Sequence, residues 1–155
     1  METIKDIADL CMRNRDLIRQ GRQLLLDVLQ VLDTYKLPFE YTQRVRVRSW
    51  GLPYVVDLHL GRRDGTYFSI PHGYYAIISA ASLSQPGSEI EDKYIILVLK
   101  SLPEHLKRLK DLLTSEHNML QKVIDELKAY LDSPEVATIL VSKRLQEASG
   151  PSPSP

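Results

Sequence analysis

Cysteine is almost absent from this chain of 155 residues, which contains only Cys11. One thiol cannot form a disulfide within the chain, so the composition excludes a disulfide-stapled fold and favours a reducing compartment, for which we expect the cytoplasm. Because Cys11 stands among apolar positions that recur every seven residues, we expect a small buried side chain there. No apolar run approaches the roughly 18 to 20 residues that cross a membrane, so the sequence predicts no membrane partner.

An excess of charge of one sign is also missing. The chain has 20 basic and 20 acidic residues, so no net field draws it to nucleic acid, and any such binding must come from a local patch. The hydrophobic share of 43% and the charged share of 26% are typical of a folded globular protein. The sequence predicts a single α+β domain over residues 1–148, followed by a flexible tail rich in serine and proline over residues 149–155.

Spacings that identify metal, phosphate or nucleophile sites are missing as well. His72, His105 and His117 show no ligand spacing with one another or with Cys11. The seven glycines are too scattered for a phosphate loop, and no serine stands in a nucleophile-elbow sequence. The sequence therefore predicts no metal and no cofactor, and favours a protein that is not an enzyme.

Apolar heptads are the strongest pattern that is present. They predict long amphipathic helices over residues 4–36, 103–131 and 134–148, with Pro103 as the start of the second. The apolar stripe of that second helix is wider than a two-stranded seam requires, so we expect an interface in a homo-oligomer or a hetero-complex, with a helix of the chain's own core as the alternative. The predicted interface residues are Leu106, Leu109, Leu113, Leu120, Val123 and Leu127.

Strict alternation over residues 40–48 predicts a strand with one apolar and one basic face. A second strand over residues 54–60 and a third over residues 66–70 complete an antiparallel meander over residues 40–70, which the helices flank. Residues 71–101 stay ambiguous between strand and helix, although the acidic residues before Tyr94 favour a helix over residues 94–99. Residues 84–88 are predicted to form a loop.

Basic side chains gather at one side of this predicted sheet. Three arginines share a face of the first strand, and two more follow in the turn after the second strand, with a tryptophan nearby. Such a patch suits phosphate, and an aromatic ring beside it suits stacking on a base. The alternative is a solvated face whose arginines pair with Glu40 or Asp57. The predicted nucleic-acid-binding residues are Arg44, Arg46, Arg48, Arg62, Arg63 and Trp50.

One set of polar residues raises an enzymatic alternative. Asp57 and His59 project from the same face of one predicted strand, and Glu91 and Lys93 follow later in the chain. An aspartate combined with a Glu-x-Lys tripeptide is typical of metal-dependent nucleases. In this chain the apolar segment follows the tripeptide, whereas the nuclease order places it before.

The order of helix, β insert and helix resembles prefoldin, whose subunits join two coiled-coil arms through β hairpins that assemble into a barrel. The stretch Ser69–Ile77 is similar to the glycine-containing hairpin of that family. The resemblance implies a chaperone-like arm protein. Our leading hypothesis from the residues themselves is a non-enzymatic assembly module that oligomerises through its helices and contacts nucleic acid through its arginine face.

Overall fold

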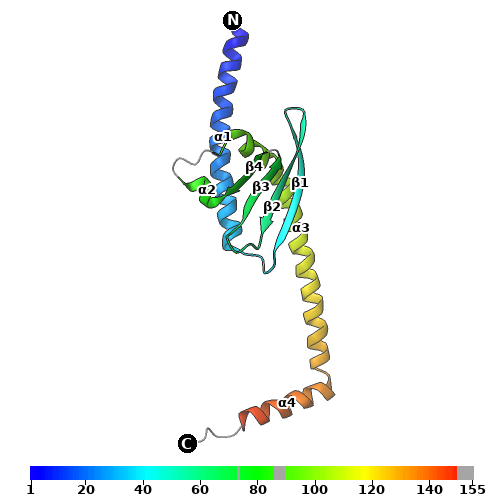
Figure 1. Cartoon of the computed structure of the whole chain (residues 1–155). Coiled ribbons are helices and arrows are strands. Elements are labelled where there is room, and N and C mark those ends of the chain that lie inside the picture. The colour runs from blue at the N-terminus through cyan, green and yellow to red at the C-terminus, as the bar shows by residue number, and fades with distance from the viewer. Residues whose placement is uncertain (73, 86–89, 150–155) are drawn as a thin grey trace, which may run out of the picture. The chain divides into compact units, whose positions relative to one another are not determined.

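The structure is a computed structural model that describes residues 1–72, 74–85 and 90–149. It confirms an α+β fold with long helices around an antiparallel sheet (Figure 1). The elements are α1 (Glu2–Thr34), β1 (Tyr41–Ser49), β2 (Leu52–Leu60), β3 (Tyr67–His72), β4 (Tyr74–Ser79), α2 (Ala80–Ser84), α3 (Asp92–Leu131) and α4 (Pro134–Ala148). The chain divides into two compact units, Met1–Arg108 and Leu109–Pro155.

The sheet of the first unit is a meander of four strands in the order β1-β2-β3-β4, all antiparallel to their neighbours. Its register pairs Val45 with Val56 and Leu58 with Phe68, which places these apolar side chains on one face of the sheet. The predicted meander over residues 40–70 is therefore confirmed, and β4 extends it. Because β1 is the first strand in this order, it forms one edge of the sheet.

The hydrophobic core lies between the apolar face of the sheet and the helices. Leu25 and Leu29 of α1 are fully buried, as are Ile95 and Val98 of α3. Burying side chains of this size contributes roughly 1.5 to 3 kcal/mol each. The sheet supplies Val45, Val56, Leu58, Leu60, Phe68, Ile70 and Ile78 to this core.

Only the second half of α1 takes part in the core. Gly21 is buried so close to α3 that an added Cβ would lie 2.3 Å from Cδ1 of Leu99, so the two helices approach closely there. All residues from Met1 to Leu17 are exposed. The prediction that Cys11 is buried is therefore wrong, because this thiol lies in the exposed first half of α1. The start of α1 extends beyond the sheet (Figure 1).

Helix α3 starts eleven residues earlier than the sequence predicted. Pro103 lies inside it, so the prediction that this proline begins a helix is wrong. A proline in a helix interior removes one backbone hydrogen bond and usually ends or kinks the helix. Burial on both sides of the proline, with Val98 before it and His105 after it, outweighs that loss and keeps one helix.

The ambiguous segment contains elements of both kinds. Residues 74–79 form β4, which leads directly into the short helix α2, capped by reciprocal bonds between Ser79 and Ser82. Residues 94–99 lie in α3, as the acidic residues before them favoured. The loop predicted over residues 84–88 lies mostly outside the described residues. The tail predicted over residues 149–155 lies outside them as well, apart from Ser149.

The second unit contains the distal part of α3 and the whole of α4. Between Lys110 and Ser149 every described residue is exposed or half-buried, and none is buried. Beyond Leu109, the described part of this unit therefore has helices but no buried apolar side chain. Within the described parts of the chain, no helix is long and apolar enough to cross a membrane.

Candidate functional site

The turn between β1 and β2 holds its tryptophan in an unusual backbone conformation. Trp50 has φ +53° and Gly51 has φ +73°, the pattern of a two-residue hairpin turn in which both central residues are left-handed. Glycine or asparagine normally fills the first of these positions, because a bulky residue there costs about 1–2 kcal/mol. The indole is 57% exposed, so burial does not compensate for the strain.

Two of the predicted arginines are already paired. The guanidinium of Arg44 donates two hydrogen bonds to the carboxylate of Asp57, at 2.8 and 2.9 Å. This bidentate contact raises the pKa of Arg44, first through the hydrogen bond and then through the charge of Asp57. Arg62 donates to Glu40 at 3.0 Å and to Thr42 at 2.9 Å. These pairs match the alternative in which the arginines form a solvated, ion-paired face.

The other predicted arginines are differently placed. Arg48 donates to the carbonyl oxygen of Gly51 at 3.2 Å and so steadies the turn that carries Trp50. Arg46 and Arg63 have neither a hydrogen bond nor an ion pair with any side chain that the structure describes. The six predicted residues therefore do not act as one uniform patch.

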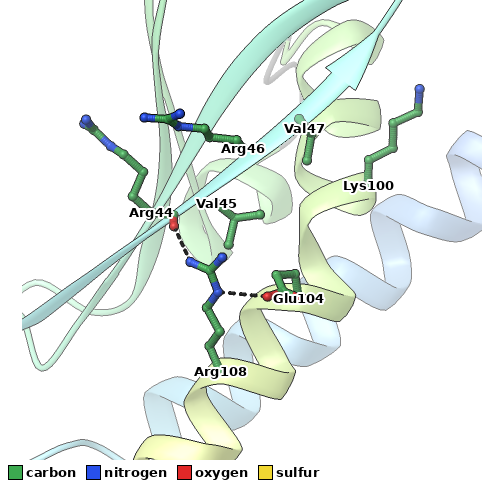
Figure 2. Close-up of a pocket in the computed structure, with 7 residues that line it drawn as sticks. All are labelled: Arg44, Val45, Arg46, Val47, Lys100, Glu104 and Arg108. Atoms are coloured by element: carbon green, nitrogen blue, oxygen red, sulfur yellow. Dashed lines mark hydrogen bonds and ion pairs between the residues drawn. The ribbon is translucent and has the colours of Figure 1, made fainter.

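A groove lies along the edge formed by β1, where this strand meets α3 (Figure 2). Its volume is about 580 Å³. From β1, Val45 and Val47 turn their side chains toward α3, while the side chains of Arg44 and Arg46 point away from α3 (Figure 2). Two cations that the sequence analysis missed, Lys100 and Arg108, line the groove from α3. The seven lining residues are Arg44, Val45, Arg46, Val47, Lys100, Glu104 and Arg108.

The three groove residues of α3 could have been found from the sequence. Lys100, Glu104 and Arg108 recur every four positions, so they share one face of any helix that includes all of them. Placing the start of that helix at Pro103 separated Lys100 from the other two. A continuous helix over residues 92–131 would have predicted the cluster.

Hydrogen bonds join α3 to β1 at the groove. Arg108 donates to the backbone carbonyl of Arg44 at 2.8 Å, and within α3 it also donates to Glu104 at 2.9 Å (Figure 2). Lys100 donates from Nζ to the hydroxyl of Ser49 at 2.8 Å, and its ammonium lies 5.9 Å from the centre of the Trp50 ring. This cation–π distance places the tryptophan turn beside the groove.

The charged side chains around the groove are largely paired or directed away from it. Glu104 is bonded to Arg108, and Asp57 is bonded to Arg44. Arg46 and Lys100 have no acidic partner among the described residues, but the side chain of Arg46 points away from α3 (Figure 2). Among the described residues, Lys100 is therefore the cation on the α3 side of the groove that has no acidic partner.

The residues of the enzymatic alternative are not gathered into one site. Asp57 is bonded to Arg44, while Glu91 pairs with Lys93 at 3.6 Å. His59 bonds the hydroxyl of Ser69 at 2.7 Å, and partial burial lowers the pKa of this histidine. Ser69 is only 1% exposed, so its hydroxyl has no access for a substrate. Among the described residues, no three His, Cys, Asp or Glu side chains are placed to hold a metal ion.

A buried histidine fixes α3 to the sheet. His105 is fully buried, and its Nε2–H donates to the carbonyl of Val56 at 3.0 Å. Its other ring nitrogen, Nδ1, accepts from the amide of Gln43 at 2.7 Å. Burial lowers the pKa of His105 from 6.5 to about 4, so the imidazole is neutral at pH 7. These two hydrogen bonds join α3 to β1 and β2.

Five of the six predicted interface residues are exposed in the single chain. Leu109 is the exception, since it is only 5% exposed and belongs to the chain's own core. The exposed five run along α3, with Leu120 at 58% and Leu127 at 54%. Neighbouring exposed residues widen their stripe, and these are Met119, Ile124, Tyr130 and Leu131.

The chain was compared with protein-family models, with curated proteins and with solved structures, and none of the three comparisons found a match. Function must therefore be argued from the groove and from the exposed helix faces.

Proposed function

We propose that this protein is a non-enzymatic assembly module that self-associates through the apolar stripe of distal α3. The observation that carries this proposal is the absence of any buried residue between Lys110 and Ser149 in the described helices. Distal α3 carries a stripe of leucine and other large apolar residues that Glu116 interrupts. A helical segment without a core gains little stability from its own hydrogen bonds in water. Its apolar face gains stability when another helix covers it.

The stripe has the spacing of a helix interface. Leu113, Leu120 and Leu127 recur every seven residues, Val123 lies between the last two, and Tyr130 follows Leu127 by three positions. A seven-residue repeat keeps one face of a helix against a supercoiled partner. Since Met119, Ile124 and Leu131 flank this seam and are also exposed, the interface is wide enough for more than one neighbouring helix.

A second copy of the chain is the partner that this segment fits. Residues 110–131 carry three lysines and four carboxylates, a net charge of −1, so two copies repel each other only weakly. Symmetric association of identical patches is also the commonest arrangement of soluble oligomers. The free half of α1 offers further apolar surface, with Leu10 and Leu17 more than half exposed at a spacing of seven residues.

The experiment measures the molar mass of the full chain by light scattering over a concentration series. We compare wild type with the double variant Leu120→Asp and Leu127→Asp. The matched control is Ser115→Asp with Asn118→Asp, which adds the same two charges on the opposite face of α3, because successive residues are 100° apart around a helix. Circular dichroism checks that all three proteins contain the folded sheet.

Wild type and control are expected at a multiple of 17.7 kDa, and the leucine double variant at 17.7 kDa. A wild type that remains at 17.7 kDa at the highest concentration contradicts self-association and leaves a different protein as the partner. A control that dissociates as fully as the leucine variant would show that added charge, and not loss of the stripe, is responsible.

The chaperone alternative has one observation in its favour. Large apolar side chains are exposed at the start of α1, including Ile4 at 68% and Ile7 at 56%. Such an arm end could hold an unfolded client, as the resemblance to prefoldin implies. An aggregation assay on an unfolded model protein distinguishes this function from assembly, since Ile4→Ser with Ile7→Ser should abolish protection and leave the molar mass unchanged.

A further inference from the structure

The open edge of β1 carries backbone groups that no neighbouring strand uses. A turn of two residues joins β1 to β2, so the closing pair of Ser49 and Leu52 exchanges backbone hydrogen bonds. Bonded and non-bonded pairs alternate along an antiparallel ladder, so every second residue of β1 directs its N–H and C=O away from β2. The residues that face the open edge in this way are Thr42, Arg44, Arg46 and Arg48.

Two observations agree with this assignment. Pro53, which has no N–H to donate, lies opposite Arg48, in a pair that needs no backbone hydrogen bond. The carbonyl oxygen of Arg44 accepts a hydrogen bond from the side chain of Arg108, so it faces the open edge and not β2 (Figure 2). Within the described ranges, no hydrogen bond from outside the sheet reaches the backbone of Arg46 or Arg48. A further strand can therefore pair with these two residues.

The groove between β1 and α3 lies beside this open edge. Val45 and Val47 turn their side chains toward α3 there, and Val47 is only half-buried (Figure 2). A strand added next to β1 would direct every second side chain to the same side of the sheet, because side chains of a strand alternate between its two faces. The groove, with a volume of about 580 Å³, has room for such side chains, and Val47 offers them apolar contact.

The opposite face of β1 favours acidic side chains on an added strand. Arg46 and Arg48 lie opposite apolar residues of β2, and neither has an acidic partner in the part of the chain that the structure describes. Arg44, by contrast, lies opposite Asp57 and is bonded to it. Side chains directly opposite each other on neighbouring strands interact, and opposite charges there stabilise the pairing. A strand on the open side of β1 could supply the carboxylates that Arg46 and Arg48 lack.

We propose that the edge of β1 binds an extended segment of a partner protein, which adds antiparallel as a fifth strand and alternates acidic with apolar residues. In this mode of recognition, main-chain hydrogen bonds supply affinity and alternate side chains supply specificity. The main chain of the segment pairs with the backbone of Arg46 and Arg48, and its acidic side chains lie beside their guanidinium groups. Its apolar side chains point toward α3 and enter the groove.

The arginines of β1 also argue against a second copy of this strand as the occupant. Symmetric pairing of two β1 strands would place the arginine row of one copy beside the same row of the other, and like charges directly opposite each other are destabilising. The open edge does not include distal α3. Binding at this edge is therefore a function beyond self-association, and either can fail without the other.

Amide hydrogen exchange of the full chain tests the open edge without a ligand. The amides of Arg46 and Arg48 should exchange quickly, whereas those of Val45 and Val47, which are bonded to β2, should exchange slowly. Slow exchange at all four amides in dilute protein would overturn the proposal, because the edge would then be closed. Protection of Arg46 that appears only at high protein concentration would also overturn it and would identify a second copy as the occupant.

The binding probe is a short labelled peptide of alternating glutamate and valine, titrated into the full chain and followed by fluorescence anisotropy. In antiparallel pairing the residue beside Arg46 points its side chain to the same face and its N–H to β1, so the glutamate amides bond to the edge. Methylation of the glutamate amides should weaken binding roughly tenfold, and methylation of the valine amides should leave it unchanged. Equal effects of the two methylated peptides would rule out strand addition. So would equal binding of a peptide of the same composition with its glutamates and valines in separate blocks.

A charge reversal tests the part of Arg46. Arg46→Glu should bind the glutamate peptide roughly tenfold more weakly than wild type, and should bind a peptide of alternating lysine and valine more tightly than wild type does. The matched control is Arg63→Glu, which makes the same charge change at an exposed position outside the groove and should match wild type with both peptides. Circular dichroism verifies that both variants fold. Equal weakening by the two variants, or no binding by folded wild type at low salt, would refute the proposal.

Discussion

Acidification from pH 7 to pH 4 is expected to destabilise the first unit through His105. This imidazole is fully buried, and burial is the main cause of its lowered pKa of about 4. Protonation would also disrupt its hydrogen bonds. A proton on Nδ1 would face the amide N–H of Gln43, and rotating that amide would break its bond to the carbonyl of His105. The fold therefore selects the neutral ring.

The sign and size of the effect follow from the two pKa values of His105. Well above pH 6.5 the ring is neutral in both the folded and the unfolded chain, so His105 contributes no pH dependence to the free energy of unfolding there. Between pH 6.5 and about 4 the unfolded chain binds a proton that the folded chain does not, so stability falls with pH. The loss is about 2 kcal/mol at pH 5 and approaches roughly 3 kcal/mol at pH 4 and below.

Urea denaturation followed by circular dichroism at pH 7, 6, 5 and 4.5 measures this loss. The same series on His105→Gln removes the histidine, so its stability should fall by about 2 kcal/mol less between pH 7 and pH 5 than that of wild type. His59, whose pKa is also lowered by burial, titrates in the same direction but is present in both proteins. Equal pH dependence in the two would refute the reasoning. So would an NMR titration of folded wild type in which His105 titrates near pH 6.5.

Three further substitutions test two turns and the ion pair between Arg44 and Asp57. Gly61→Ala should lower the free energy of unfolding by roughly 3 kcal/mol in urea denaturation. The reason is that a Cβ at φ +68° would lie 1.9 Å from the carbonyl oxygen of Phe39. A loss below about 1 kcal/mol would contradict this close approach. Asp57→Asn should lower the free energy of unfolding by about 1–2 kcal/mol in urea denaturation, because it removes the charged acceptor of two hydrogen bonds from Arg44. An unchanged free energy would show that this pair contributes nothing to stability. Trp50→Asn should raise the melting temperature, since asparagine relieves about 1 kcal/mol of strain at φ +53°. If that variant is less stable than wild type, the turn is not strained as described.

Much of the fold could be predicted from local pattern. Alternation in residues 41–49 identified which side chains of β1 face the core, because successive side chains of a strand point to opposite faces. Heptads identified α1 and the distal part of α3, because apolar residues at this spacing lie on one face of a helix. The boundary at Pro103 could not be predicted this way. A proline usually ends a helix, and only burial of Val98 and His105 on either side of it keeps α3 continuous.

The candidate site was only partly predictable. The sequence identified Arg46 and Trp50, but it grouped them with Arg62, which the folded chain pairs with Glu40. Ion pairs between residues 22 positions apart depend on the register of strands and turns, and no spacing rule supplies that register. Lys100 was missed because the helix was predicted to start at Pro103, and its bond to Ser49 of β1 joins residues 51 positions apart.

By itself, the sequence determined the class of fold, the meander and the apolar stripes, because each depends on a periodicity that neighbouring residues impose on one another. The tertiary structure alone decided which cations are paired, which histidine is neutral at pH 7, and that the thiol of Cys11 is exposed. Those properties depend on solvent access and on partners distant in sequence. Local sequence pattern cannot predict solvent access or distant partners, because these arise only when the helices pack against the sheet.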